Sequence, residues 1–267
     1  MKAYLSLFRI RFIATLQYRA AAFMELFTNF LWGMMEILAF AAFYKANPDS
    51  FAMTFPQTVS YMWMQQAFLM LFRGMNWDDS LPATIENGTV AYELVRPSDL
   101  YYRWFTQSAA TRLANAALRC WPILLIAFLL PKPYRMQFPP DLMHFVLFAA
   151  SMLLGLGVVV AFSMLMYISV FHTMSRRGVK LVAGQLSDFL SGAIVPLTFY
   201  PPALRKVLEL TPFAAMQNMP LRIYNGNFTI QESLEGICLQ IMWLIVLWGI
   251  GYLWMRRSLH RVVVQGG

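Results

Sequence analysis

Acidic and amide side chains recur on one face of an apolar segment near the start of the chain. Glu25, Asn29 and Glu36 are separated by four and then seven residues, so on an α-helix they fall within about 40° of one another. A carboxylate in the middle of a bilayer costs roughly 2.5–3.5 kcal/mol. Such a face is expected to point at protein or water, where it could hold an ion or pair with a basic side chain.

Other charged residues also lie inside apolar segments. Asp188 shares a helical stripe with small residues that would let another helix approach closely, namely Gly184, Ser191 and Gly192. Arg112 and Arg119 are seven residues apart on a different apolar segment and could pair with the acids.

Together these polar residues are candidates for a substrate path or a gating ion pair: Glu25, Asn29, Glu36, Asp188, Arg112 and Arg119. Two alternatives remain open. The residues could form structural bonds between helices, or they could reach a membrane interface with their polar ends. The second alternative suits Glu25 best, because it lies close to one end of its apolar segment.

The sequence contains no motif of an enzyme or a nucleotide-binding protein. His144, His172 and His260 lie in different segments and in no metal-binding spacing. Neither G-x-S-x-G nor G-x-x-x-x-G-K-[ST] occurs. Cys120 and Cys238 are too few for a disulfide framework or a metal site. We therefore expect no catalytic site, metal or cofactor in this chain.

The elements that position these side chains are long apolar runs. A helix needs roughly 20 apolar residues to cross about 30 Å of hydrocarbon, and a soluble domain would interrupt such runs with charges. The chain is 59% hydrophobic and 13% charged over 267 residues, which indicates one all-α membrane domain over 1–267. We predict an interfacial helix over 1–19 and six transmembrane spans over 20–44, 56–72, 110–130, 142–171, 181–200 and 233–255.

Basic residues are distributed unevenly around these spans. With both termini in the cytosol, thirteen of the 21 Lys and Arg residues lie on the inner side and six on the outer side, while two lie at or inside the third span. This bias is typical of multi-pass proteins. It supports the short second span, because removing that span would place the termini on opposite sides. The net charge of +8 then reflects topology and lipid headgroups, and nucleic acid is not expected as a partner.

The most polar stretch, at 80–105, falls on the predicted inner side. Residues 85–88 have the composition of a turn, and the stretch that follows carries Val90, Tyr92, Leu94 and Val95 as apolar and aromatic side chains around Glu93 and before Arg96. Pro97-Ser98-Asp99 is expected to end one short helix and cap the next. A short amphipathic helix in the cytosol could dock in a groove on a soluble partner. A plain connector is the alternative.

Three features resemble the ABC-2 type exporter permeases, in particular a bacterial branch of uncharacterised drug-export-like permeases. The inner segment 88–97 (GTVAYELVRP) is similar to that branch's G…L.RP segment. The order of six spans after a basic N-terminal helix is also similar. The third feature is a proline-punctuated stretch that is similar to the family's outer segment of short re-entrant helices, here Pro196, Pro201, Pro202, Leu204, Leu208, Leu210, Pro212 and 222–226 within the outer segment 201–232.

The resemblance implies a type V exporter-like fold and an ATP-driven mechanism. Two permeases, identical or different, would pair above two separate ABC ATPase subunits that hold ATP and Mg²⁺. Residues 86–99 would form the coupling helix, which ATPase closure would push so that spans one, two and five rock. Substrate would leave outward between the two permeases. The implied coupling residues are Glu86, Gly88, Tyr92, Glu93, Leu94, Arg96 and Pro97, of which Glu93 and Arg96 would make charged contacts and Tyr92 and Leu94 apolar ones.

We therefore expect a permease subunit of an ATP-binding-cassette exporter in a bacterial plasma (inner) membrane. Its apolar and aromatic spans suit an amphiphilic small molecule, a lipid or a peptide, and the acids of span one favour a cation. One alternative is an ion-coupled secondary transporter that uses Glu25, Glu36 and Asp188, whose flux would follow an ion gradient and ignore ATP depletion. A membrane enzyme or an assembly scaffold is the other.

Overall fold

The long helices of this computed structural model define a membrane protein. The structure describes residues 2–17, 19–46 and 51–260, and these ranges contain helices and no strands. Within them, four helices are long and apolar enough to cross a membrane: α2 (Arg19–Ala46, apolar from Glu25), α7 (Leu100–Leu129), α8 (Leu142–Thr173) and α14 (Ile230–Leu259). They confirm the all-α class, and they coincide with the spans predicted over 20–44, 110–130, 142–171 and 233–255.

Shorter helices connect and fill the spaces between the four long ones. Their bounds are α1 (Lys2–Leu16), α3 (Phe55–Ala67), α4 (Leu69–Phe72), α5 (Ser80–Glu86), α6 (Val90–Leu94), α9 (Arg176–Val179), α10 (Gln185–Leu190), α11 (Pro202–Glu209), α12 (Pro212–Met216) and α13 (Asn218–Tyr224). A π-helical turn over Lys180–Gly184 joins α9 to α10, and a 3₁₀ turn over Leu197–Phe199 precedes α11.

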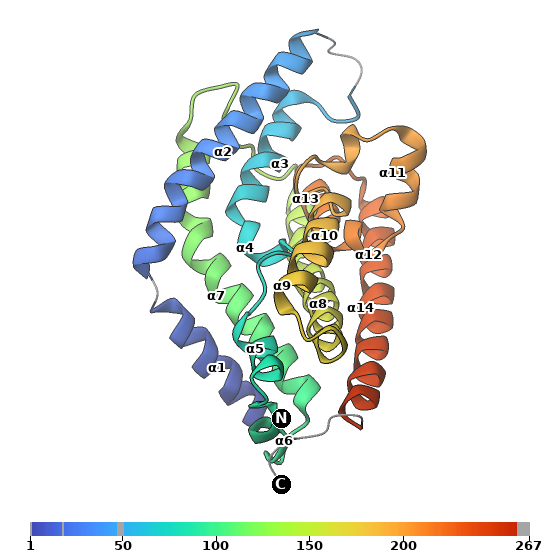
Figure 1. Cartoon of the computed structure of the whole chain (residues 1–267). Coiled ribbons are helices and arrows are strands. Elements are labelled where there is room, and N and C mark those ends of the chain that lie inside the picture. Colours follow the sequence, from blue (N-terminus) through green and yellow to red (C-terminus); the bar gives the residue numbers. More distant parts are fainter. Residues whose placement is uncertain (1, 18, 47–50, 261–267) are drawn as a thin grey trace.

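α8 is the central helix of the bundle. It contacts α14 along its length, α7 over its second half, α12 at its middle and α13 near its start. α2 and α3 pack against α7 on the opposite flank. Figure 1 shows α1, α5 and α6 at the lower end and α11 near the upper end. The segments that the sequence assigned to opposite sides of the membrane are 80–105 and 201–232; α5 and α6 of the first and α11 of the second lie at opposite ends, whereas α12 lies beside the middle of α8.

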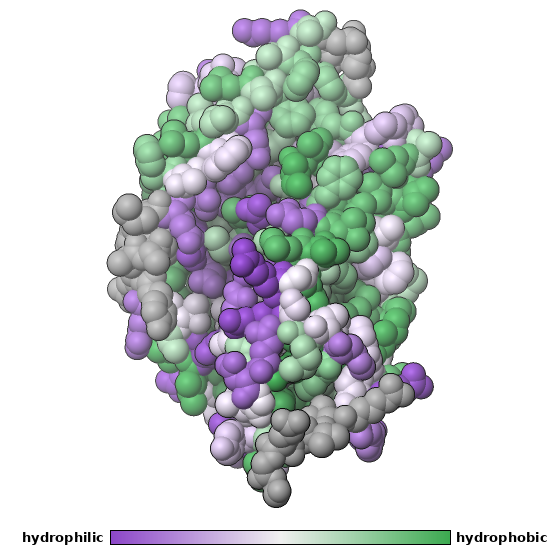
Figure 2. All heavy atoms as spheres, in the orientation of Figure 1, coloured by the Kyte–Doolittle hydropathy of each residue, from purple (hydrophilic) through white to green (hydrophobic). Residues whose placement is uncertain are grey.

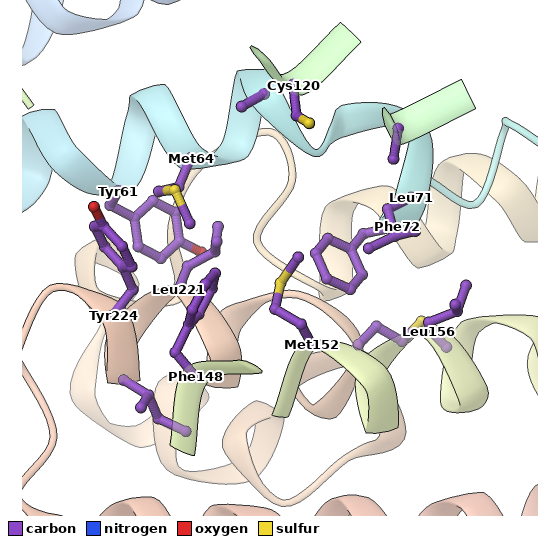
Figure 3. Close-up of a cluster of buried hydrophobic side chains, with 14 of the residues drawn as sticks. Tyr61, Met64, Leu71, Phe72, Cys120, Phe148, Met152, Leu156, Leu221 and Tyr224 are labelled. Atoms are coloured by element: carbon purple, nitrogen blue, oxygen red, sulfur yellow. The ribbon is translucent and has the colours of Figure 1, made fainter. Parts of the chain in front are cut away.

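The main hydrophobic core surrounds the short helix α3. Every residue from Thr58 to Ala67 is buried, because α2, α7 and α13 all pack on this one helix. Figure 3 shows side chains of α3 and α4 facing those of α8 and α13, among them Tyr61, Met64, Leu71, Phe72, Phe148, Met152, Leu156, Leu221 and Tyr224. A helix buried on all sides carries no polar stripe, which is why this segment is hard to delimit from its sequence.

The predicted second and fifth spans are interrupted helices. The helix over 56–72 breaks at Phe68, which separates α3 from α4. The helix over 181–200 begins earlier, at Arg176, passes through the π-helical turn and stops at Leu190. Fifteen helical residues reach about 22 Å, so this helix is shorter than a full crossing. The count of six crossings stays a prediction.

The two interrupted helices meet closely inside the bundle. A Cβ on Gly74, just after α4, would lie 2.9 Å from Cβ of Ser187. A Cβ on Gly184 would lie 2.8 Å from Sδ of Met75. The small residues around Asp188 thus admit an extended segment, where the sequence had indicated a second helix.

The N-terminal helix α1 lies against the first half of α7. Its Arg11 forms an ion pair with Asp78 and donates to Ser80 at 2.8 Å and to Thr111 at 3.3 Å. α1 is therefore tied both to α7 and to the start of α5. Its predicted position in the membrane interface stays a prediction.

Alanine substitution at Gly155 tests how closely α8 and α12 pack. A Cβ on Gly155 would come within 2.5 Å of the carbonyl oxygen of Met216. We expect Gly155→Ala to separate the two helices at a cost of about 1–3 kcal/mol. Gly249 on α14 is the matched control, because a Cβ there meets nothing within 4 Å. Gly249→Ala should keep or raise the stability, by up to about 1 kcal/mol.

The measurement is thermal unfolding of both purified variants in detergent. We expect Gly155→Ala to melt below wild type and Gly249→Ala to melt at or above it. If Gly155→Ala and Gly249→Ala melted at the same temperature, the close packing of α8 against α12 at Gly155 would be contradicted.

Candidate functional site

A polar pocket lies where α2, the end of α4 and the turn after α10 meet. Its volume is about 330 Å³, and its lining residues are Thr28, Asn29, Trp32, Glu36, Gln66, Leu69, Arg73, Ala193 and Ile194. Asn29 and Glu36 are candidates from the sequence, and the structure places both in the wall. The pocket therefore collects residues from the first, second and fifth predicted spans.

α2 contributes three polar or aromatic side chains to this wall at helical spacing. Asn29, Trp32 and Glu36 follow one another by three and four residues, which places them on one face. Gly33 sits beside them, and a Cβ there would lie 3.0 Å from Cγ of Gln66. This close approach of α2 to α3 lets the Gln66 amide donate to Glu36 Oε2 at 3.1 Å.

A charged corner holds the chain where it leaves α4. Asp188 Oδ2 accepts from Arg73 Nε at 2.9 Å, and its Oδ1 accepts from the Gly74 backbone N–H at 2.6 Å. Arg112 Nη1 donates to the carbonyls of Leu71 and Arg73 at 3.1 and 3.0 Å. The sequence had suggested that Arg112 could pair with an intramembrane acid. It binds backbone carbonyls instead, and Arg73 is the ion-pair partner of Asp188.

Glu25 and Arg119 form a separate pair away from the pocket lining. Arg119 Nη2 lies 2.6 Å from Glu25 Oε2, and Arg119 Nη1 also donates to Asn115 Oδ1 at 3.1 Å. The pair joins α2 to α7. The three residues of the acidic face therefore separate into two environments: Glu25 has a cationic partner, whereas Asn29 and Glu36 line the pocket.

Sequence reasoning missed several residues of this wall. Arg73 follows an apolar run directly, and the thirteen basic residues assigned to the inner side include it. Gln65 and Gln66 are polar residues within the short second predicted span. Gln65 donates to the Ala193 carbonyl at 2.9 Å, whereas Gln66 donates to Glu36, so the two adjacent glutamines bind different segments. Two adjacent amide side chains within an apolar run are the sequence signal that could have indicated polar contacts to other helices at this position.

A second candidate surface lies at the lower end, on α5 and α6. α5 ends at Glu86, and the turn follows at 87–89, where Gly88 has a φ of 70°. The turn expected over 85–88 therefore begins two residues later, because residues 85 and 86 complete the helix. Asp99 caps α7 by accepting from the Tyr102 N–H at 3.2 Å. The helix between these points covers only Val90–Leu94, so the continuous helix over 86–99 that the resemblance implied is not present.

The tip of α6 exposes apolar side chains. Tyr92 is 74% exposed, Val95 80% and Leu94 40%. Arg96 and Pro97 are exposed beside them. Val95 was quoted in the sequence motif but not counted among the coupling residues. A monomer rarely leaves such a group of side chains uncovered without a binding role.

Ion pairs tie this tip to the rest of the bundle. Glu86 accepts from the Arg176 backbone N–H at 2.6 Å and contacts Arg176 Nε at 3.1 Å, at the start of α9. Glu93 forms an ion pair with the buried Arg103 of α7. Its carboxylate therefore faces α7, although the resemblance had implied charged contacts to a partner. Ion pairs thus join α6 to α7 and the end of α5 to α9.

Figure 2 shows how these two sites relate on one face of the molecule. Hydrophilic residues gather down its middle, from the level between α2 and α10 to α5 at the lower end. Apolar surface flanks them on both sides. Among the residues that the structure describes, no three His, Cys, Asp or Glu side chains gather as a metal site.

The model of the ABC-2 family transporter proteins matches residues 30–266 of this chain. The chain belongs to the ABC-2 transporter family. The match includes the pocket residues from Phe30 onward, the α5–α6 region and the whole outer segment. No curated protein matches the chain significantly.

Membership in the ABC-2 family fixes the general class of this protein. It is a multi-pass membrane protein of a transport system and a permease by type, which makes an enzyme unlikely. ABC-2 permeases work with an ABC ATPase subunit, which is a separate polypeptide.

Proposed function

We propose that this chain is the permease subunit of an ABC exporter that moves an amphiphilic small molecule, lipid or peptide outward. A separate ATPase, which binds ATP and Mg²⁺, drives it. The observation that carries the proposal is the exposed apolar tip of α6, which an ion pair connects to α7, beside the end of α5, which an ion pair connects to α9. In this proposal the ATPase docks on the exposed tip, and the ion pairs transmit the displacement of the docked helices to the rest of the bundle.

The coupling residues divide into two groups in this proposal. Tyr92, Leu94 and Val95 contact the ATPase with apolar surface, and Arg96 and Pro97 border that contact. Gly88 allows the tight turn before α6, because its positive φ disfavours other residues. Glu86 and Glu93 transmit displacement, since their carboxylates bind Arg176 and Arg103.

A second permease would complete the substrate path. α2 is the least buried of the four long helices, and two residues of the pocket wall are strongly exposed, Trp32 at 56% and Ile194 at 49%. We propose that α2 and the segment after α10 face the second permease, identical or different, with the path between them. Membrane lipid covers the remaining apolar surface.

The topology that fits this arrangement places the lower end in the cytosol of a bacterial cell. Both termini then lie inside, at the plasma (inner) membrane, and the interrupted second and fifth helices bring the crossings to six. The outer helices α11, α12 and α13 dip back toward the membrane before α14. The basic residues Arg176, Arg177 and Lys180 at the start of the fifth segment support this orientation.

The test is purification of the tagged chain from its native membrane, followed by transport in inside-out vesicles. We expect an ABC ATPase subunit to co-purify, and we expect export that requires ATP hydrolysis and resists a protonophore. Export that persists without ATP and stops with the protonophore would instead indicate the ion-coupled secondary transporter. Loss of the co-purifying ATPase without loss of transport would also contradict the proposal.

A further inference from the structure

We infer that the pocket between α2, α4 and the turn after α10 binds organic cations, with Glu36 as the carboxylate that receives the positive group. The inference names a substrate class and rests on the proposed function only in that respect. Binding itself needs no ATPase.

Glu36 forms no ion pair among the residues that the structure describes. Its carboxylate accepts from the neutral Gln66 amide at 3.1 Å. Arg73 is the cation in the same wall, but its Nε is bound at 2.9 Å to Asp188. Asp188 thus holds the Arg73 side chain, and the Glu36 carboxylate is left without a salt bridge in the wall of the pocket.

Arg112 is the other cation nearby, and it lies behind the corner formed by 71–74. Its donors bind the carbonyls of Leu71 and Arg73 and the hydroxyl of Ser163 at 3.0 Å. It is 2% exposed and is not part of the pocket lining. Glu25, the other acid of α2, is already paired with Arg119. Glu36 is therefore the acid of α2 that is left to bind a ligand's positive group.

Two neighbours of Glu36 on the same helix face suit a cation with an aromatic or apolar body. Trp32 is 56% exposed beside the pocket, and an indole ring attracts a cation placed over its face. Asn29 is 7% exposed, and its Nδ2 has no hydrogen-bond partner among the described residues. This buried donor would be satisfied by an acceptor on the ligand.

An anionic ligand fits the same wall poorly. A negative group beside Arg73 would lie near the carboxylates of Asp188 and Glu36, and like charges at short distance in a poorly hydrated site repel strongly. A cation beside Glu36 meets a carboxylate, an aromatic face and two amides. The volume of about 330 Å³ lies at the lower end of small-molecule sites, so the favoured ligand is a small organic monocation that fills the pocket.

The test measures binding to the purified full-length chain without any ATPase. The probe is radiolabelled tetraphenylphosphonium, and tetraphenylborate, of matched shape and opposite charge, is measured in separate samples. We expect saturable binding of the cation and no saturable binding of the anion. Glu36→Gln should weaken it by about tenfold, while the shape of the side chain and its place beside Gln66 remain.

Glu25→Gln is the matched control, because it neutralises an acid of the same helix outside the pocket. Its affinity for tetraphenylphosphonium should equal that of wild type. Trp32→Leu should reduce affinity while the pocket keeps its charge. Size-exclusion profiles identical to wild type show that the variants are folded.

Two results would overturn the inference: equal affinity in Glu36→Gln and wild type, or preferential binding of tetraphenylborate. If either occurred while an ATPase co-purified and drove export, the cation site would be wrong and the proposed function would stand. If tetraphenylphosphonium bound as expected and no ATPase drove export, the proposed function would be wrong and the site would stand.

Discussion

Replacing Tyr92 and Val95 together with glutamate is expected to abolish ATP-driven transport and the retention of the ATPase. Both side chains are more than 70% exposed, so the folded chain loses little packing when they change. At an interface, aromatic and aliphatic anchors in a partner's pocket each contribute about 2 kcal/mol or more, which is about 30-fold in affinity. A charge in such a pocket would be desolvated without a partner.

The measurement is co-purification of the ATPase with the tagged variant, alongside its melting temperature. Asn87→Glu is the matched control, because it adds a negative charge to the same exposed turn and removes no apolar surface. We expect the control to retain the ATPase and the double variant to lose it at unchanged stability. If the double variant kept a full complement of ATPase and full transport, the tip of α6 would not be the coupling surface.

Asp188→Asn is expected to have the second large effect, on stability as well as transport. Asp188 is 1% exposed, and it holds both the Arg73 side chain and the Gly74 backbone. Its partner Arg73 is 40% exposed, so the charge left behind can be hydrated, and the cost is that of a lost hydrogen bond to a charged group, about 1.5–3 kcal/mol. The asparagine can still accept from Gly74, so the loss reports mainly on the charge.

The double variant Asp188→Asn with Arg73→Gln separates the ion pair from the rest of the corner. Because it leaves neither charge unpaired, its apparent melting temperature should be higher than the sum of the two single effects predicts. Transport should remain impaired in all three variants, since the corner joins the second and fifth segments. Strictly additive losses would show that Arg73 and Asp188 are not coupled.

Local patterns predict the long helices well. The bilayer-length apolar runs gave α2, α7, α8 and α14 to within a few residues at most ends, although α7 begins ten residues before the predicted span, at Leu100. It does so because Asp99 caps it there, and the first turns lie below the apolar stretch. The cap itself was readable from Pro97-Ser98-Asp99, because capping depends on neighbours in sequence.

The pocket depends on contacts that hydropathy does not record. Gln66 reaches Glu36 across 30 residues, and Gln65 reaches the Ala193 carbonyl across 128. Arg73 pairs with Asp188 across 115 residues. A positive-inside count treats Arg73 as one more cytosolic charge, since only the fold shows that the chain leaves α4 inside the bundle. Spacing on a single helix, in contrast, was enough to place Asn29 and Glu36 on one face.

The orientation of the α6 tip is the most direct test of a permease driven from the cytosol. Single cysteines replace Val95, at the tip, and Phe138, 78% exposed in the loop between α7 and α8, in a chain whose Cys120 and Cys238 have been changed to serine. A membrane-impermeant maleimide is then applied to intact and permeabilised cells. We expect the cysteine at 138 to react in intact cells and the cysteine at 95 to react only after permeabilisation. Reaction of the cysteine at 95 in intact cells would place the coupling surface outside the cell, where no ATPase could drive it.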